Sequence, residues 1–267
     1  MTAPLYLVPA GRLDGLVPGS PVELDGDDAR HAVTVRRTRV GEHVDLADGA
    51  GLRAACVVTA VETGGRQARL VAEVVGVAAV PVRLPRLVLV QALAKGGRDE
   101  LAVETATELG VDAVLPWQAD RSVVVWAAER GERSRQRWVA TAQAAAKQSR
   151  RAVLPVVEPV RDTAALVARV VAVVARRGAV LVLHEQAITA MADAELPGVT
   201  VLGDAAVEGT TEVLVVVGPE GGITDDEVVA LTGAGAVAVR LGPEVLRSSS
   251  AGPAALAVLS ARLGRWA

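Results

Sequence analysis

The stretch from Val213 to Glu227 constrains the fold more than any other part of the chain, because an apolar run there leads into a glycine-rich loop. Five consecutive valine and leucine residues, 213–217, are typical of a strand buried on both faces, as in a parallel α/β sheet. Thr224, with Glu227 three residues later, predicts a capping box and therefore the start of a helix. The segment predicts one strand–loop–helix unit of an α/β fold.

The loop in this unit, Gly218-Pro219-Glu220-Gly221-Gly222, has the composition of a ligand-binding loop. Glycines let a backbone approach a bound molecule closely. Pro219 removes an N–H donor, and Glu220 places a negative charge where a phosphate cradle has a lysine. We expect a cationic or hydroxyl-rich ligand rather than a phosphate. Glu220 itself has no evident structural role here beyond attraction to a helix N-terminus, worth under roughly 1 kcal/mol.

Composition excludes several classes of protein. The 267 residues are 51% hydrophobic, enough for the core of one large or two modest globular domains. A single cysteine, Cys56, rules out a disulfide framework and suits a reducing cytoplasm, where we expect the protein to reside. Three widely separated histidines predict no metal site. No span reaches the roughly 20 apolar residues of a membrane helix, so we expect no membrane partner.

Charge is unevenly distributed. The net charge of −3 argues against a nucleic-acid partner, yet the region 121–161 holds nine basic and three acidic residues. A predicted helix over 132–149 places one stripe along a face, comprising Arg137, Thr141, Ala144, Gln148 and Arg151. A second basic cluster occupies 30–39. Both clusters suit contact with nucleic-acid phosphates, and the alternatives are a solvated helix face and an exposed basic strand.

The pattern of apolar residues predicts two domains. Residues 1–78 alternate in the manner of short strands, with turn signals at Asp25-Gly26, Asp48-Gly49 and Gly64-Gly65, and predict a small β-barrel domain. Two prolines make 78–86 an extended linker. Residues 79–267 then predict alternating strands and helices. We expect strands over 87–91, 113–115, 179–183, 213–217 and 237–241, and helices over 99–109, 132–149, 163–177, 251–263 and directly after Thr224.

Three of these strand ends break into loops of unusual composition: 183–185, 218–222 and 241–247. Ligands bind at the carboxyl ends of strands in parallel sheets, so we expect the three loops to converge on one pocket. A plain Gly-Pro turn after the last strand and a helix-capping role for His184 are alternatives. The sequence has no Gly-x-Ser-x-Gly elbow, and no Gly-x-Gly-x-x-Gly follows the first α/β strand.

Taken together, six segments resemble the bacterial ribosomal RNA small-subunit methyltransferase E family. They are Lys95–Arg98, Thr107–Val111, Gln148–Arg151, Leu183–Glu185, Gly218–Gly222 and Leu241–Arg247. The resemblance implies a SPOUT-type, mostly parallel α/β domain with a C-terminal trefoil knot, preceded by a small PUA-like β-barrel. It also implies a homodimer that uses S-adenosyl-L-methionine to methylate uridine N3 in small-subunit (16S) ribosomal RNA, near the decoding centre. The expected RNA partner is this rRNA or the assembled 30S subunit.

The resemblance also implies the site residues. Those for the cofactor are Leu183, His184, Glu185, Val217, Gly218, Pro219, Glu220, Gly221, Gly222, Leu241, Gly242, Val245 and Leu246. Those for RNA are Arg36, Arg37, Lys95, Arg98, Arg137, Gln148 and Arg151, and no metal is implied. Arg247 is the expected catalytic residue, because a guanidinium beside the base steadies an anionic uracil.

Two positions depart from the family pattern: Glu244 replaces an arginine and Ser249 replaces a glutamate. These departures favour one alternative, an RNA-binding ribosome-assembly factor of the same fold with weak or no catalysis. A nucleotide-dependent oxidoreductase is a second alternative, disfavoured by Pro219 and by the missing dinucleotide fingerprint.

Overall fold

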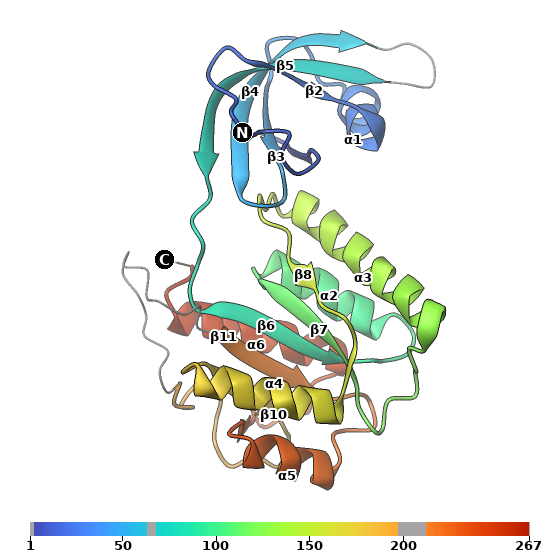
Figure 1. Cartoon of the computed structure of the whole chain (residues 1–267), viewed down its shortest axis with the longest axis vertical. Coiled ribbons are helices and arrows are strands. Elements are labelled where there is room, and N and C mark those ends of the chain that lie inside the picture. The colour runs from blue at the N-terminus through green and yellow to red at the C-terminus, as the bar shows by residue number, and fades with distance from the viewer. Residues whose placement is uncertain (1–2, 63–67, 197–211, 267) are drawn as a thin grey trace. The chain divides into compact units, whose positions relative to one another are not determined.

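The computed structural model describes residues 3–62, 68–196 and 212–266. The chain divides into two compact units, and each is described by itself. The β unit comprises Met1–Val82 with Ala146–Leu154, and the α/β unit comprises Arg83–Ala145 with Pro155–Ala267. Figure 1 shows the elements of both. The turn signal at Gly64-Gly65 lies outside the described residues.

The β unit is built on a five-stranded sheet in the order β1-β3-β4-β5-β2. Its strands are β1 (Leu5–Leu7), β2 (Pro21–Leu24), β3 (His43–Ala47), β4 (Leu52–Glu62) and β5 (Arg69–Ala79). Only β1 and β3 pair in parallel among these strands, and the remaining pairs are antiparallel. Inward-facing residues such as Val44, Leu46, Val58 and Leu70 form its core, as the alternating pattern predicts.

The basic segment 30–39 is helical up to Val35 and contains no strand, so the alternative of an exposed basic strand is wrong. Helix α1 (Gly26–Arg30) continues into a π-helical turn, η1 (His31–Val35). The buried residues Ala29, Ala32 and Val33 follow a helical spacing, which places them on one inward face. Arg36 and Arg37 follow directly and are exposed, with Arg37 in a left-handed conformation (φ 56°) that ends the turn.

The α/β unit contains a seven-stranded sheet in the order β12-β10-β11-β6-β7-β8, with β9 also paired to β7. All its pairings among the described strands are parallel, which confirms the prediction of a parallel sheet. Its strands are β6 (Arg86–Ala92), β7 (Ala113–Gln118), β8 (Val156–Val157), β9 (Arg161–Asp162), β10 (Ala179–Leu183), β11 (Glu212–Val217) and β12 (Val237–Val239).

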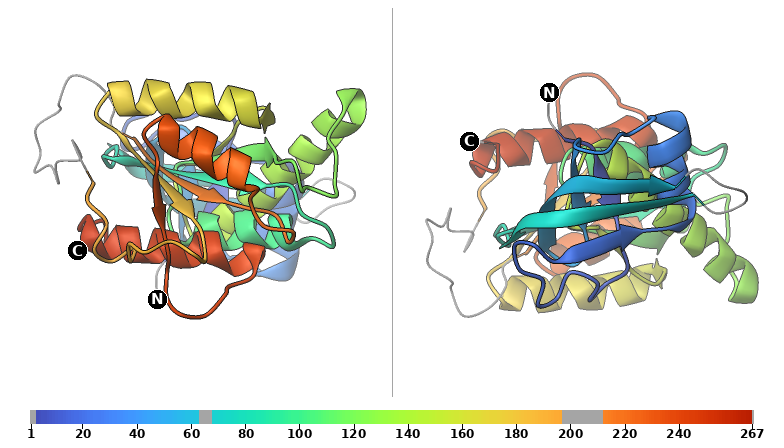
Figure 2. Two further views of the ribbon diagram at one scale, coloured as in Figure 1. Left: turned by 90° about the horizontal axis from the view of Figure 1, so that it is seen from below. Right: turned by 90° about the horizontal axis from the view of Figure 1, so that it is seen from above.

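Helices cover both faces of this sheet (Figure 2). They are α2 (Arg98–Glu108), α3 (Ala128–Gln148), α4 (Thr163–Ala175), α5 (Asp225–Gly233) and α6 (Ser248–Arg262). Side chains of α2, α3 and α6 pack into one core cluster, whereas those of α4 and α5 pack into the other. No helix in the described part of the chain is long and apolar enough to cross a membrane.

The C-terminal end of α3 shortens the stripe of residues that was predicted for this helix. Helix α3 ends at Gln148, and Arg150 takes a left-handed conformation (φ 58°) directly after it. The amide of Arg151 then donates to the carbonyl of Ala146 (2.8 Å), a bond typical of a helix C-terminus. Arg151 therefore lies beyond the helix, and the predicted stripe stops at Gln148.

The C-terminal end of α6 is fastened to the start of the sheet by Arg265, which is 8% exposed. Its guanidinium donates to both carboxylate oxygens of Asp112, at 2.8 and 3.2 Å. It also donates to the carbonyls of Pro85 (2.8 Å) and Gly110 (3.2 Å). Asp112 in turn accepts a hydrogen bond from the amide of Leu87 (2.8 Å), so this ion pair joins the end of α6, β6 and the turn before β7.

We expect Arg265→Met to lower the free energy of unfolding by about 3–5 kcal/mol, because it leaves the partly buried carboxylate of Asp112 without its cation. Urea unfolding measures the change. Arg176→Met is the matched control, since Arg176 is exposed at the end of α4 and its loss should cost under about 0.5 kcal/mol. Equal stability of the two variants would contradict the anchoring role of Arg265.

Candidate functional site

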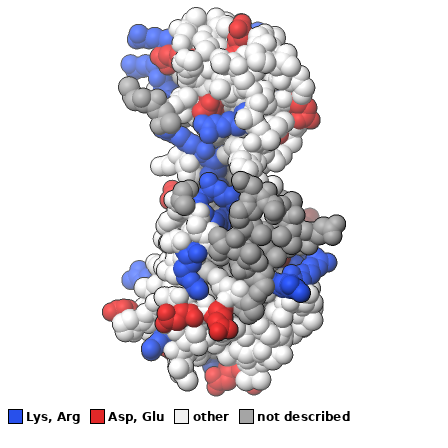
Figure 3. Space-filling model, turned by 90° about the vertical axis from the view of Figure 1, so that its left-hand side faces the viewer, with Lys and Arg blue, Asp and Glu red and all other residues white. Residues whose placement is uncertain are grey.

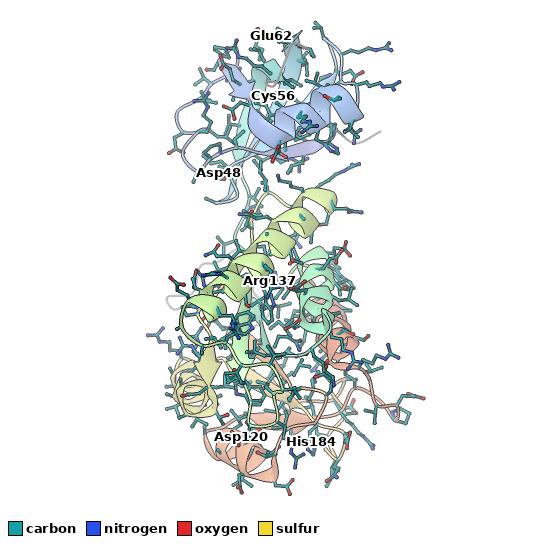
Figure 4. All side chains as sticks on the ribbon, turned by 90° about the vertical axis from the view of Figure 1, so that its right-hand side faces the viewer. Asp48, Cys56, Glu62, Asp120, Arg137 and His184 are labelled. Carbon is teal, nitrogen blue, oxygen red and sulfur yellow. The ribbon has the colours of Figure 1, made fainter. Side chains whose placement is uncertain are left out.

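The loops that follow β10, β11 and β12 line one cavity of about 560 Å³ at the carboxyl edge of the parallel sheet. All thirteen residues that the resemblance implies for the cofactor line it, as do Arg247 and Arg98. A cavity of this size lies within the range of roughly 300–1,000 Å³ of small-molecule sites. Figure 4 shows Asp120 and His184, which follow β7 and β10, at the same end of the α/β unit.

The loops after β10 and β12 are tied together by backbone hydrogen bonds. The amide of His184 donates to Val239 O (2.9 Å), and the amide of Arg240 donates to Thr189 O (3.0 Å). His184 Nδ1 accepts a hydrogen bond from the amide of Gln186 within its own loop (3.3 Å), so its ring stabilises a turn there and caps no helix. The loops after β10 and β12, joined by backbone hydrogen bonds, therefore form one wall of the cavity.

The loop after β11 needs its glycines for packing within the protein. A Cβ on Gly218 would lie 2.6 Å from Ile223 Cγ1, and a Cβ on Gly221 would lie 3.2 Å from Arg121 Cβ. Gly222 has a φ of +76°, which favours glycine. The sequence argument was that these glycines allow a ligand to approach the backbone closely. In the structure, Gly218 and Gly221 are instead in close contact with protein atoms.

Glu220 has a structural role that the sequence argument denied. Its Oε1 accepts hydrogen bonds from the amide of Lys95 (3.2 Å) and from the guanidinium of Arg98 (3.0 Å). The carboxylate thereby braces the loop between β6 and α2 against the loop after β11. The same β6–α2 loop is fixed from within by Asp99, whose carboxylate accepts from the amides of Ala94 and Glu100 and whose pKa is raised by burial.

Glu227 is a buried carboxylate, 2% exposed, at the start of α5. The predicted capping box with Thr224 is present, and Glu227 Oε2 accepts from both the amide and the hydroxyl of Thr224 (3.0 Å each). Its other oxygen accepts from Thr163 Oγ1 (2.8 Å) and from the amide of Asp120 (2.9 Å). Glu227 thus joins the cap of α5 to the loop after β7.

Sequence reasoning did not assign Arg121 to the site. It follows β7, lines the cavity, and donates from Nη1 to the carbonyl of Gly221 (3.0 Å). The available signal was its position three residues after the end of β7, because the carboxyl ends of all the parallel strands lie at the same edge of the sheet.

The third loop leads into α6, and Arg247 is the N-cap residue of this helix. The carbonyl of Arg247 accepts from the amides of Ser250 and Ala251 (2.9 Å each), which fixes its backbone. Its side chain is exposed and has no hydrogen-bond partner among the described residues. Ser248 Oγ, just inside the helix, is buried without a partner in the described part of the chain. Glu244 is exposed on the same loop.

The residues expected to contact RNA lie on several elements. Arg36 and Arg37 are exposed after η1, Lys95 is exposed in the β6–α2 loop, and Arg98 is half-buried against Glu220. On α3, Arg137 and Gln148 are exposed, whereas Arg151 lies past its end. Figure 4 shows Arg137 on this helix. Arg137 donates to Ser134 Oγ (2.9 Å), a contact that leaves its other N–H groups available.

Two kinds of chemistry find no support in the described residues. No group of three or more His, Cys, Asp or Glu side chains among them could hold a metal ion. Cys56 is buried in β4, and burial raises the pKa of its thiol to about 11, so at neutral pH it is protonated and weakly nucleophilic.

The sequence matches two family models. Residues 82–260 match an RNA methyltransferase domain, and residues 24–70 match an RNA methyltransferase PUA domain. The chain is also 47% identical over 248 residues to the ribosomal RNA small subunit methyltransferase E of Mycobacterium tuberculosis, with 93% of this chain and 89% of that protein covered. The chain belongs to the ribosomal RNA small subunit methyltransferase E family.

Less similar relatives support the same family assignment. The protein of the same name from Bacillus subtilis is 28% identical over 237 residues, covering 89% of this chain and 88% of that one. A ribosomal RNA small subunit methyltransferase E from Neisseria gonorrhoeae, whose crystal structure holds S-adenosyl methionine, superposes with a TM-score of 0.77 at 26% identity. That comparison covers 98% of each chain. The expected α/β fold with a PUA-like domain is confirmed, and the trefoil knot stays a prediction.

We expect Gly218→Val to lower the free energy of unfolding by about 1–3 kcal/mol, because the new side chain overlaps the buried Ile223. Urea denaturation gives the value. Gly76→Val is the control, since a Cβ there meets nothing within 4 Å and Gly76 has an ordinary strand conformation in β5. If Gly218→Val were as stable as the control, the tight packing of this loop would be refuted.

Proposed function

We propose that this chain transfers a methyl group from S-adenosyl-L-methionine to N3 of a uridine in small-subunit ribosomal RNA, near the decoding centre. The observation that carries the proposal is the convergence of three strand-end loops on one cavity in a member of this family. The S-adenosyl methionine held by the Neisseria gonorrhoeae relative supports the choice of cofactor.

The cavity residues fit this cofactor. Leu183, Val217 and Leu241 offer apolar surface for an adenine ring, and the loop backbones offer hydrogen-bonding groups. Glu185, Asp225 and Glu244 supply carboxylates for ribose hydroxyls or for the positive charge of the sulfonium. Glu220 is engaged by Arg98, so we assign it to bracing the cavity and not to direct charge pairing. The bound cofactor supplies an electrophilic methyl group.

We infer that the two parts of the chain have different functions. Residues 1–78 bind RNA as a PUA-like domain, and residues 79–267 form the catalytic domain. The match of residues 24–70 to an RNA methyltransferase PUA domain supports this, as do the exposed arginines that follow η1. Figure 3 shows basic side chains on one face of the β unit. A separate grip on the RNA suits an enzyme whose target base must leave its stack.

We infer that the chain acts as a homodimer. Large apolar side chains are exposed on loops at the carboxyl edge of the sheet: Val123 (71%), Ile188 (93%) and Val245 (74%). Large apolar side chains exposed on several loops at one edge of a sheet suit a surface that another protein covers. A second copy of the chain is the partner that the family resemblance implies.

Arg247 is the residue to which we assign catalysis. Uridine N3 holds its proton at neutral pH, so the reaction needs negative charge on the uracil ring to be stabilised as the N–H proton leaves. The Arg247 side chain lines the cavity and has no partner among the described residues, so its N–H groups are available to the base. A preformed donor at the point where charge develops is worth about 10²- to 10³-fold in rate.

Calorimetric titration tests the cofactor assignment. We expect S-adenosylhomocysteine to bind and NADH not to bind, because the cavity offers carboxylates and no phosphate cradle. Binding of NADH alone would support the oxidoreductase alternative and overturn the proposal. Binding of S-adenosylhomocysteine without methylation of rRNA would instead favour an assembly factor of the same fold.

RNA contact should depend on salt. Removing two phosphate contacts with Arg36→Ala and Arg37→Ala should weaken rRNA binding and reduce the log–log salt slope by about 0.7–0.9 per contact. The pair Arg137→Ala and Arg151→Ala should act likewise. Arg176→Ala is the control, since that arginine lies at the end of α4, outside both clusters. Unchanged salt slopes would show that these arginines are solvated surface residues that do not contact RNA phosphates.

Arg247→Ala should lower turnover by about 10²-fold or more while S-adenosylhomocysteine affinity changes little. Raising the pH should partly rescue the variant, because more of the uracil is then already deprotonated. Methyl transfer to rRNA at saturating cofactor gives the rate. Loss of cofactor binding with normal turnover per bound site would show that Arg247 is structural.

A further inference from the structure

A second guanidinium, that of Arg121, lines the same cavity as Arg247. Arg121 follows β7, whereas Arg247 follows β12, and the sheet order places β10, β11 and β6 between these two strands. Both side chains nevertheless border one cavity, Arg121 from the loop after β7 and Arg247 from the N-cap position of α6.

Arg121 is held in place before any ligand binds. Its Nη1 donates to the carbonyl of Gly221 at 3.0 Å. The absence of a side chain at Gly221 makes room for it, since a Cβ there would lie 3.2 Å from Arg121 Cβ. Within the described residues, the remaining N–H groups of this guanidinium have no hydrogen-bond partner. The arginine is therefore fixed at one nitrogen and free to donate with the others.

The loop that carries Arg121 is fixed by Glu227. The amide of Asp120, the residue before Arg121, donates to Glu227 Oε1 (2.9 Å). Burying a carboxylate is costly unless its oxygens are satisfied, and both oxygens of Glu227 are, although no cation pairs with it in the described part of the chain. The N-terminus of α5 offsets part of its charge. The buried carboxylate of Glu227, whose desolvation costs free energy, thus lies where it fixes the backbone of the Arg121 loop.

We propose that Arg121 is a second catalytic residue, which donates hydrogen bonds to one carbonyl oxygen of the target uracil, and that Glu227 is the residue that positions it. This inference rests on the proposed function. When N3 loses its proton, the negative charge spreads onto O2 and O4, which lie on either side of N3. Two guanidiniums that line one cavity can each donate hydrogen bonds to one of these oxygens.

The reaction balances with these residues as hydrogen-bond donors only. The N3–H proton leaves to solvent or to a nearby base, the bond between sulfur and the methyl carbon breaks, and the bond between N3 and that carbon forms. The products are N3-methyluridine, S-adenosylhomocysteine and a proton.

The decisive experiment compares Arg121→Ala and Arg121→Lys with the wild-type protein in single-turnover methyl transfer to small-subunit rRNA, across a range of pH. Arg121→Ala should lower the rate by about 10²-fold at neutral pH, with S-adenosylhomocysteine affinity nearly unchanged. The rate should keep rising with pH beyond the point at which the wild type levels off. Arg121→Lys should restore part of the rate, and Arg176→Ala should behave as the wild type.

Two results would overturn the role of Arg121. Loss of S-adenosylhomocysteine affinity with a normal rate at saturating cofactor would mean that Arg121 binds the cofactor or supports its loop. A uniform loss of rRNA affinity with an unchanged pH profile would mean that it contacts a phosphate. The product of the wild type separates this inference from the proposed function. If the wild type makes N3-methyluridine and Arg121→Ala is fully active, only the inference about Arg121 fails; if the wild type methylates another atom, the proposed function fails.

Glu227 is tested by a double-mutant cycle. Glu227→Gln keeps the shape of the side chain but turns one acceptor into a donor, so the Asp120 amide or Thr224 loses its partner. We expect Glu227→Gln to lower the single-turnover rate and shift the pH profile in the same direction as Arg121→Ala. In the Arg121→Ala background, Glu227→Gln should have little further effect on rate. Fully additive losses would show that Glu227 supports the fold of α5 and does not act through Arg121.

Discussion

The site depends on parallel pairing of the strands around β11. Because β10, β11, β6 and β7 run in the same direction, the loops that leave them all emerge at one edge of the sheet. The cavity forms there from loops far apart in the sequence. Hydrogen bonds tie the described parts of these loops to their neighbours, so much of the cavity is built before a ligand arrives. Preformed sites of this kind lose little free energy in ordering when they bind.

Two carboxylates from the β11–α5 segment connect the loops at this edge of the sheet. Glu220 reaches the β6–α2 loop, and Glu227 reaches the loop after β7. One segment thus braces the loops on its neighbours' strands, and its glycines give Arg121 the room to approach. The segment that carries the strongest sequence signal is also the one that organises the cavity, which explains why its composition differs so much from that of an ordinary turn.

Local patterns were predictable from the sequence. The apolar run 213–217 and the Thr224–Glu227 box gave the right strand and the right helix start, since both depend on contacts within a few residues. The three strand-end loops were expected to converge, and they line one cavity. The segment 30–39 was harder, because the short apolar run Ala32-Val33 fits either a strand or a helix until its buried partner Ala29 is known.

Long-range contacts could not be predicted in the same way. The partner of Glu220, the Lys95 amide, is 125 residues away, so a sequence-based argument found no structural role for this carboxylate. Arg121 was missed for the same reason, since its contact with Gly221 depends on strand order and not on spacing. Family resemblance adds what neither pattern nor geometry contains, namely the identity of the RNA and of the atom that receives the methyl group.

Nucleoside mass spectrometry of small-subunit rRNA, from cells with and without the gene for this chain, tests whether the cavity serves methyl transfer to uridine N3. We expect one N3-methyluridine to disappear when the gene is deleted and to return with the wild-type gene but not with the Arg247→Ala variant. An unchanged set of modified nucleosides, or the loss of a methyl group from a different atom, would contradict it.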